Sequence, residues 1–452
     1  MPRRLSVKST SLILFQLAAF LFYAWLRFDN ARIVHEPRSF GDSPDYFRIA
    51  SLPVLSAEFW TESKPPLTSF FWKLVNSEPE RIFDLQLYIS TLCWGVLAAA
   101  FAQVIRSQYI KPFSFALVLG FSLSRDVFMW DPFLGSESLA LSFTALFLSC
   151  GLWLLSDYKP YKIGLLLFTA FLMVFTRDTY AYVLLMATAV ILVLFWSTRY
   201  RRAVALMSAA FVILYLFSSA LANAGLRPYR AVLMITALRV FPSEEYTDYF
   251  RTHGIPVDDA LVEKSRAIER EDKFEVYKAL YADPAQEEYR RWAHELGRRD
   301  YFKFLWFFKS DTLQKVFLET PGQSFYPDVY YYTATGYHPI IKDTRLSEFL
   351  YPTRYGLVFF FAANILAAFL AAVAWQERKV LWLLPLLMVL LTYPQAVLVW
   401  AGDANDIARH SVAHNVLLRL GAWMLAFFVL DYLFLDILPK LTFFKRGPLS
   451  SR

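Results

Sequence analysis

Long apolar stretches separated by short polar segments dominate the pattern along this 452-residue chain. About 20 apolar residues in a helix suffice to cross the hydrocarbon core of a bilayer. Stretches of this kind lie at 11–27, 85–105, 136–156, 162–176, 178–197, 203–221, 354–375, 380–400 and 411–435. A shorter stretch, 112–124, would cross only if it is tilted or enclosed by other helices. The pattern therefore predicts an all-α polytopic membrane protein with about ten transmembrane helices.

Two longer connections, both expected to be extracytoplasmic, interrupt this pattern. The second of them separates an N-terminal part of the chain from a C-terminal part. Residues 1–221 form an N-terminal transmembrane module, 222–353 form a region of ordinary soluble charge density, and 354–452 hold the C-terminal helices and tail. The first long connection, 28–84, contains two amphipathic segments at 45–51 and 66–75, which we expect to lie at the membrane interface. In the second, 284–317 has helical apolar spacing and 321–339 is expected to be loop, with tyrosines that could form an acceptor platform.

Composition agrees with the membrane prediction. The chain is 57% hydrophobic and only 19% charged, whereas soluble domains carry roughly 25% charged residues. The net charge of +7 could indicate nucleic acid, but the cations stand beside apolar runs, so we expect membrane lipids and no nucleic acid as partners. The two cysteines, Cys93 and Cys150, both fall in apolar segments and cannot build a disulfide framework.

Basic residues gather in alternate connections between the predicted spans. The basic segments are the N-terminus, 106–111, 159–162, 199–202, 378–379 and the C-terminal tail, whereas the intervening short loops hold only Arg125, Arg177 and Arg409. The positive-inside rule then places both termini in the cytoplasm, and the alternation requires 112–124 to cross the membrane. We expect a multi-pass protein of the plasma (inner) membrane.

Acidic residues gather on the opposite, extracytoplasmic side, next to the predicted spans. They are Asp42, Asp45, Asp126, Asp131, Glu137, Asp178, Asp403 and Asp406. A carboxylate there could act as general base toward a hydroxyl group, and arginine or histidine could stabilise a leaving phosphate. Each acid alone could equally be a solvated loop residue. Together with the nearby arginines, they suit group transfer from a lipid-linked phosphate donor.

The first connection also carries short motifs that resemble a known family. The Asp-containing loop Gly41–Tyr46 and the Lys-Pro-Pro-Leu motif at Lys64–Leu67 resemble those of GT-C fold glycosyltransferases, as does the layout of the first 200 residues or so. This superfamily includes protein O-mannosyltransferases and lipid A aminoarabinose transferases. The chain lacks the adjacent Asp-Glu pair of the former and has fewer spans than the usual eleven to thirteen.

The resemblance implies a glycosyltransferase with its active site outside the cytoplasm. Asp42 would be the general base of an inverting displacement from a polyprenyl-phosphate-linked sugar onto a lipid, glycan or protein acceptor. Asp45, Asp126 or Asp131 would supply an acceptor or second acidic site. We expect Arg177 and Arg409 to bind the donor phosphate, with His410 assisting. No metal site or cofactor is predicted, although a divalent cation such as Mg2+ or Mn2+ could join the carboxylates.

Other interpretations of these residues stay open. Arg177 could be an interfacial arginine that reaches headgroups, and Asp406 with Arg409 could be a surface pair at i,i+3 spacing. The segment 402–406 could be a turn that begins the last helix. His410 and His414, four residues apart, could bind a metal, but a packing role is favoured for His414. The alternative function is a lipid or glycan transporter or flippase, which the scarcity of charges inside the predicted spans disfavours; a non-catalytic membrane scaffold is the third.

Overall fold

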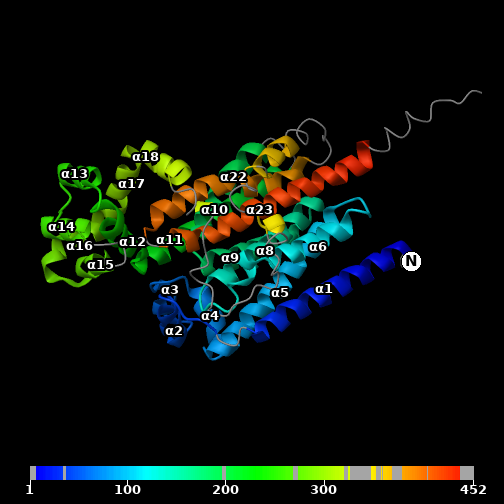
Figure 1. The fold of residues 1–452 in the computed structure, drawn as a ribbon, viewed down its shortest axis with the longest axis horizontal. Coiled ribbons are helices and arrows are strands. Elements are labelled where there is room, and N and C mark those ends of the chain that lie inside the picture. Colours follow the sequence, from blue (N-terminus) through cyan, green and yellow to red (C-terminus); the bar gives the residue numbers. More distant parts are fainter. Residues whose placement is uncertain are drawn as a thin grey trace, which may run out of the picture.

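The computed structural model shows an elongated bundle of helices with a group of short helices at one end (Figure 1). It describes residues 7–33, 37–195, 200–267, 273–319, 324–325, 348–352, 358, 360–368, 379–404 and 406–437. Within these ranges the protein is all-helical, and the one β-bridge, between Arg38 and Phe133, belongs to no sheet. The all-α prediction is therefore confirmed for the described part of the chain.

Among the described residues, six helices are long and apolar enough to cross a membrane. They are α1 (Val7–Ile33), α5 (Pro79–Val104), α8 (Glu137–Ser156), α11 (Arg201–Ala224), α22 (Lys379–Gly402) and α23 (Ile407–Tyr432). A helix rises about 1.5 Å per residue, so the shortest of these is close to the thickness of a hydrocarbon core. The start of α1 and the end of α23 lie at the same end of the bundle (Figure 1). The chain is thus a multi-pass membrane protein.

Three further apolar helices are shorter: α6 (Lys111–Ser122), α9 (Pro160–Thr176) and α10 (Thr179–Phe195). They correspond to the predicted spans 112–124, 162–176 and 178–197, and the predicted turn at 176–178 separates α9 from α10. The predicted span 354–375 falls largely outside the described residues, as do the loop and the tyrosines expected within 321–339 and the C-terminal tail. The described residues therefore hold six helices of sufficient length and apolarity to cross a membrane, and the total of about ten transmembrane helices stays a prediction.

Prolines mark where several of these helices begin. α5, α6 and α9 each carry a proline at the first or second position. A proline there costs no hydrogen bond, because the first N–H groups of a helix have no partner within it. The turns before α5 and α9 therefore end at Pro79 and Pro160, where these two helices begin.

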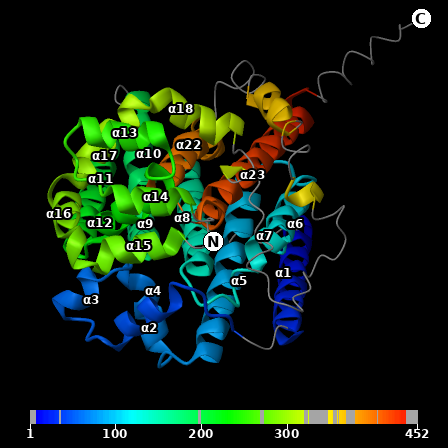
Figure 2. The same ribbon diagram turned by 60° about the vertical axis from the view of Figure 1, so that its left-hand side comes forward.

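Three short helices in the first connection lie across the end of the bundle: α2 (Ser43–Ser51), α3 (Ala57–Thr61) and α4 (Pro66–Leu74). The predicted amphipathic segments are α2 and α4; α3 was not predicted, although Ser56 caps it by accepting a hydrogen bond from Phe59 N at 3.2 Å. Trp72 of α4 is fully buried, and its ring packs against that of Tyr46 in α2. Figure 2 shows α2, α3 and α4 grouped beside the other short helices at this end.

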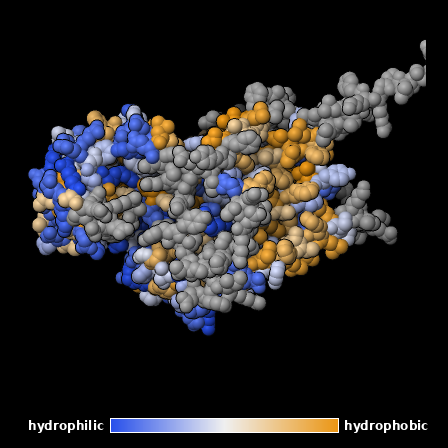
Figure 3. Space-filling view, viewed as in Figure 1, coloured by the Kyte–Doolittle hydropathy of each residue, from blue (hydrophilic) through white to orange (hydrophobic). Residues whose placement is uncertain are grey.

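The short helices between α11 and residue 319 form a polar region with its own apolar core. They are α12 (Arg227–Ile235), η1 (Thr236–Val240), α13 (Glu244–Thr252), α14 (Asp259–Ala267), α15 (Lys273–Ala282), η2 (Pro284–Gln286), α16 (Glu287–Trp292), η3 (Ala293–Gly297), α17 (Arg298–Phe307), α18 (Lys309–Gln314) and η4 (Lys315–Glu319). The helical prediction for 284–317 is confirmed, although Leu296 in its apolar stripe is exposed. Hydrophilic residues cover this end, and hydrophobic residues cover much of the rest (Figure 3).

Charged side chains are buried inside the bundle, contrary to the expectation that the spans hold almost none. Arg419, midway along α23, is fully buried and donates to Pro352 O at 2.8 Å, Phe325 O at 3.0 Å and Asn415 Oδ1 at 2.9 Å. One arginine in a 26-residue helix hardly lowers its mean hydropathy, so the pattern hid it. At the far end of the same helix, Asp431 accepts from Ser107 N at 2.6 Å and ties α23 to the connection after α5.

Candidate functional site

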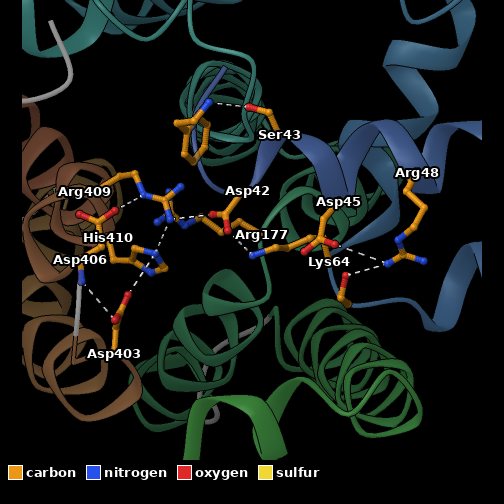
Figure 4. Close-up of polar contacts among 12 residues, drawn as sticks. Asp42, Ser43, Asp45, Arg48, Lys64, Arg177, Asp403, Asp406, Arg409 and His410 are labelled. Atoms are coloured by element: carbon orange, nitrogen blue, oxygen red, sulfur yellow. Dashed lines mark hydrogen bonds and ion pairs between the residues drawn. The ribbon is translucent and has the colours of Figure 1, made fainter. Parts of the chain in front are cut away.

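Asp42 lies at the first turn of α2 and turns its carboxylate away from that helix. Its backbone oxygen accepts from Asp45 N at 3.1 Å, but its side chain caps no helix N–H. The carboxylate instead lies between two cations: Oδ1 is 2.5 Å from Lys64 Nζ, and Oδ2 is 2.7 Å from Arg409 Nη2 (Figure 4). The side chain remains 25% exposed. Asp42 is therefore a partly accessible carboxylate held by two ion pairs.

A second segment fixes the position of Asp42. Residues 38–43 run beside 132–134: Arg38 N donates to Pro132 O, and Leu134 N donates to Arg38 O, each at 2.8 Å. Ser43 Oγ donates to Leu134 O at 2.6 Å. Since all these contacts join the loop before α2 to the buried loop before α8, Asp42 and the start of α8 are held as one unit.

Arg409, in the first turn of α23, is the centre of the charged cluster. Its guanidinium contacts three carboxylates: Asp42, Glu137 Oε1 at 3.1 Å and Asp406 Oδ2 at 2.6 Å. It also lies over the ring of Phe40, with its central carbon 4.6 Å from the centroid. The side chain is only 9% exposed. A buried guanidinium is stable only when its donors are matched in this way, so the three carboxylates account for its position.

Arg177 and His410 complete the cluster. Arg177, in the turn between α9 and α10, has Nη1 3.5 Å from Glu137 Oε1. His410 Nε2 lies 3.2 Å from Asp403 Oδ2 and 3.2 Å from Arg409 Nη2. The side chains of Asp42, Arg177, Arg409 and His410 meet in one place, although they come from distant parts of the chain (Figure 4).

The electrostatics of the cluster hold Asp42 in its ionised form. Burial alone would raise the pKa of Asp42, but the charges of Arg409 and Lys64 outweigh it and hold that pKa well below the usual range. Burial, together with the negative charges of Asp42 and Glu137, raises the pKa of nearby Tyr46. A carboxylate with so low a pKa is a weak base, so in this arrangement Asp42 behaves as an anion bound by cations.

The other predicted acids lie elsewhere. Asp45 is at the surface of α2, 3.6 Å from Arg48. Asp131 is fully buried, forms a very short ion pair with Arg27 and accepts from Ser138 Oγ at 2.6 Å. The structure does not place these two in the Asp42 cluster.

Asp126, the remaining predicted acid, is in the short helix α7 (Arg125–Phe128). Its carboxylate is 3.8 Å from the guanidinium of Arg125. Burial raises the pKa of Asp126, and the nearby charges of Arg125 and Arg419 oppose that shift. Asp126 therefore belongs to the environment of the buried Arg419 rather than to that of Asp42.

Four members of the cluster were not assigned to the site from the sequence: Lys64, Glu137, Asp403 and Asp406. Lys64 is the first residue of the Lys-Pro-Pro motif, and Glu137 is the first residue of α8. The motif and the acid at the start of a span were the available signals. Of the open interpretations, Asp406 and Arg409 do pair at i,i+3, but the pair is largely buried. Asp403 Oδ1 accepts from Asp406 N at 3.2 Å, as in a turn that begins a helix.

The residues that could hold a metal do not converge. Across the described ranges, no three His, Cys, Asp or Glu side chains form a metal-binding group. His410 pairs with Asp403, whereas the ring of His414 is buried with Nε2 2.7 Å from Ser324 O. The two histidines therefore have separate partners. What the cluster does offer is three cations, with Lys64 and Arg409 on the carboxylate of Asp42 and Arg177 beside Glu137, to which an anion could bind in place of these carboxylates.

The fold and this cluster define an all-helical, multi-pass membrane protein with a charged site where its helices end. A comparison with protein-family models finds no matching family, and one with curated proteins finds no matching relative. The argument for a function therefore rests on the site itself.

Proposed function

We propose that this chain is an integral-membrane glycosyltransferase of the GT-C type. It would move a sugar from a polyprenyl-phosphate donor to an extracytoplasmic lipid, glycan or protein acceptor. The observation that carries the proposal is the carboxylate of Asp42 held between Lys64 and Arg409, with Arg177 alongside. These groups come from α2, from the segment before α4, and from the ends of α9 and α23, where a lipid phosphate would lie.

The donor phosphate would compete with Asp42 for the same cations. Lys64 and Arg409 each hold one carboxylate oxygen now, and both can bind phosphate oxygens instead. When Lys64 and Arg409 bind the phosphate, Asp42 loses the contacts that depress its pKa and becomes a stronger base. Donor binding would thus activate the carboxylate in the step that places the sugar beside it.

The displacement itself balances without another reactant. The acceptor oxygen forms a bond to the anomeric carbon, the bond from that carbon to the phosphate oxygen breaks, and the acceptor proton passes to Asp42. The electron pair of the broken bond leaves on polyprenyl phosphate. Lys64, Arg177 and Arg409 stabilise the negative charge of this leaving group, and His410 assists them. Attack opposite the leaving group inverts the anomeric carbon.

The test is replacement of Asp42 in cells that lack the native protein. Asp42→Asn keeps the size of the side chain but removes its charge, and we expect loss of the surface glycan at normal protein level. Glu78→Gln is the matched control, because Glu78 is an exposed acid at the start of α5 whose partner is the exposed Arg81, at 2.8 Å. Unaltered glycans in the Asp42 variant would remove the proposal.

A lipid or glycan transporter is the second candidate, and one observation favours it. Arg419 is fully buried in the bundle, and Asp126 near it is only 13% exposed, so ionisable groups lie inside the protein, as on a transport path. However, Arg419 is fixed by backbone carbonyls of the chain itself, which indicates a structural role. Export of a labelled polyprenyl-phosphate lipid by purified protein in liposomes, without glycan transfer, would favour this candidate.

A further inference from the structure

The segment Arg298–Glu319, made of α17, α18 and η4, exposes large apolar side chains. The exposed fractions are 67% for Phe302, 66% for Trp306, 65% for Phe307, 48% for Leu313 and 76% for Leu318. We call these five residues the aromatic face. Exposed apolar groups scattered singly are ordinary, but several large ones on one short segment are typical of an interaction surface.

The aromatic face is not a by-product of core packing. A separate stripe of the same segment is buried, and it consists of Tyr301, Phe304, Phe308, Thr312 and Val316. Their spacing of three or four residues places them on one side of the helices, toward the protein. The helices of this segment are therefore apolar on both sides, which a helix facing water on its outer side would not be.

Contacts at both ends set the depth of the segment in the membrane. At its start, Arg298 lies 3.4 Å from Asn223 Oδ1, near the end of α11, and Tyr301 donates to Ala401 O at 2.9 Å, at the end of α22. At its far end, the ring of Phe317 is 6.2 Å from that of Tyr393. Tyr393 lies nine residues before the end of α22. At the rise of an α-helix, this places it ~14 Å along the helix axis from that end. The segment thus begins where the spans end and descends beside α22.

Basic side chains flank the aromatic face. Lys309 Nζ lies 5.0 Å from the ring centroid of Trp306, and Arg299 and Lys303 are 61% and 58% exposed. The segment carries five basic and three acidic residues. Tryptophan with lysine and arginine beside it is typical of the boundary between lipid chains and headgroups, where the ring lies in the apolar layer and the cation meets phosphate.

We propose that the aromatic face of Arg298–Glu319 is embedded in the lipid bilayer, at the headgroup boundary of the leaflet where α10 begins and α11 and α22 end, with its cations on anionic headgroups. The polar region is then held down on the membrane by a second contact besides the spans. This proposal does not depend on the glycosyltransferase activity.

The test uses nitroxide labels on the full chain in nanodiscs of phosphatidylcholine and phosphatidylglycerol. Phe302→Cys and Trp306→Cys are labelled in a background with Cys93→Ser and Cys150→Ser, and collision rates with oxygen and with a water-soluble nickel complex are measured. Ile213→Cys on the exposed side of α11 is the lipid reference. Glu275→Cys on α15, where the Glu275 side chain is 57% exposed, is the water reference.

We expect both test labels to collide more often with oxygen than with nickel, as the Ile213 label does, and the Glu275 label to show the reverse. Greater access to nickel at both test positions would show that the face lies in water. Protection from both reagents would show that a second copy or another protein covers it. Either result overturns the proposal.

Discussion

Arg409 Nη2 donates to Asp42 Oδ2 at 2.7 Å, across 367 positions of the sequence. This contact joins the connection after α1 to α23, the last described span, at the proposed site. Because Arg409 also holds Glu137 and Asp406, one guanidinium orients three carboxylates, and its replacement should affect all three.

Arg409→Gln should lower the stability of the protein strongly. Removing one partner of a buried ion pair leaves an uncompensated charge and costs about 3–5 kcal/mol. Arg48→Gln is the matched control, because Arg48 pairs with Glu62 but is 47% exposed, and an exposed pair contributes ~0–1 kcal/mol. Thermal unfolding in detergent should show a much larger drop in Tm for Arg409→Gln. Equal drops would contradict the central place of Arg409.

Asp42 should make stability depend on pH only under acid conditions. Its pKa is depressed in the folded protein, whereas the unfolded value is ~3.9. Between those values the unfolded state binds more protons, so stability falls as pH falls. The difference in Tm between the wild type and Asp42→Asn should stay constant from neutral pH down to about pH 5 and shrink below about pH 4. A difference that already shrinks at neutral pH would show that the pKa is not depressed.

Asp131 and Arg27 should behave as a coupled pair. Both are fully buried, so Asp131→Asn alone leaves the guanidinium without its counter-charge, at a cost of about 3–5 kcal/mol. Adding Arg27→Met to that variant removes the orphaned charge, and the double variant should recover part of the loss. Unfolding of the two single variants and the double variant in mixed micelles measures the coupling. Strictly additive losses would indicate that the two side chains do not interact.

Gly225 should tolerate no larger residue. A Cβ there would lie 2.4 Å from the carbonyl oxygens of Thr61 and Glu62, and such overpacking costs about 1–3 kcal/mol. Because Thr61 and Glu62 precede Lys64, Gly225→Ala should also lower the proposed transferase activity. Gly164→Ala is the control: nothing lies within 4 Å of its added Cβ, and alanine in a helix is ~1 kcal/mol better than glycine. Tm and activity of both variants decide the matter.

The sequence predicted features that follow from local pattern. The helices at 45–51 and 66–75 were predicted because their apolar residues repeat at helical spacing, and the turn at Arg177 because two apolar runs meet there. α3 was missed because five residues are too few to show a period. The residues of 354–375 lie largely outside the described part of the chain, so that span stays a prediction.

The partners of buried charges could not be predicted, because they depend on which helix faces which. The acids predicted to lie outside the cytoplasm form one group in the sequence, but the structure separates them: Asp42 pairs with Arg409, whereas Asp131 pairs with Arg27. Lys64 and Glu137 stood at recognisable positions, yet only their geometry shows that they reach the cluster. Arg419 was hidden by the apolar residues around it in α23.

The position of Arg409 in α23 also has a consequence for biosynthesis. Asp42 is made early and Glu137 follows, but Arg409, which both acids contact, is translated more than two hundred residues after Glu137. A nascent chain that has inserted only its earlier spans holds these two acids without the arginine that orients them. The site is therefore completed only when α23 enters the membrane, and a ribosome that stalls before that point leaves a product in which the cluster is unassembled.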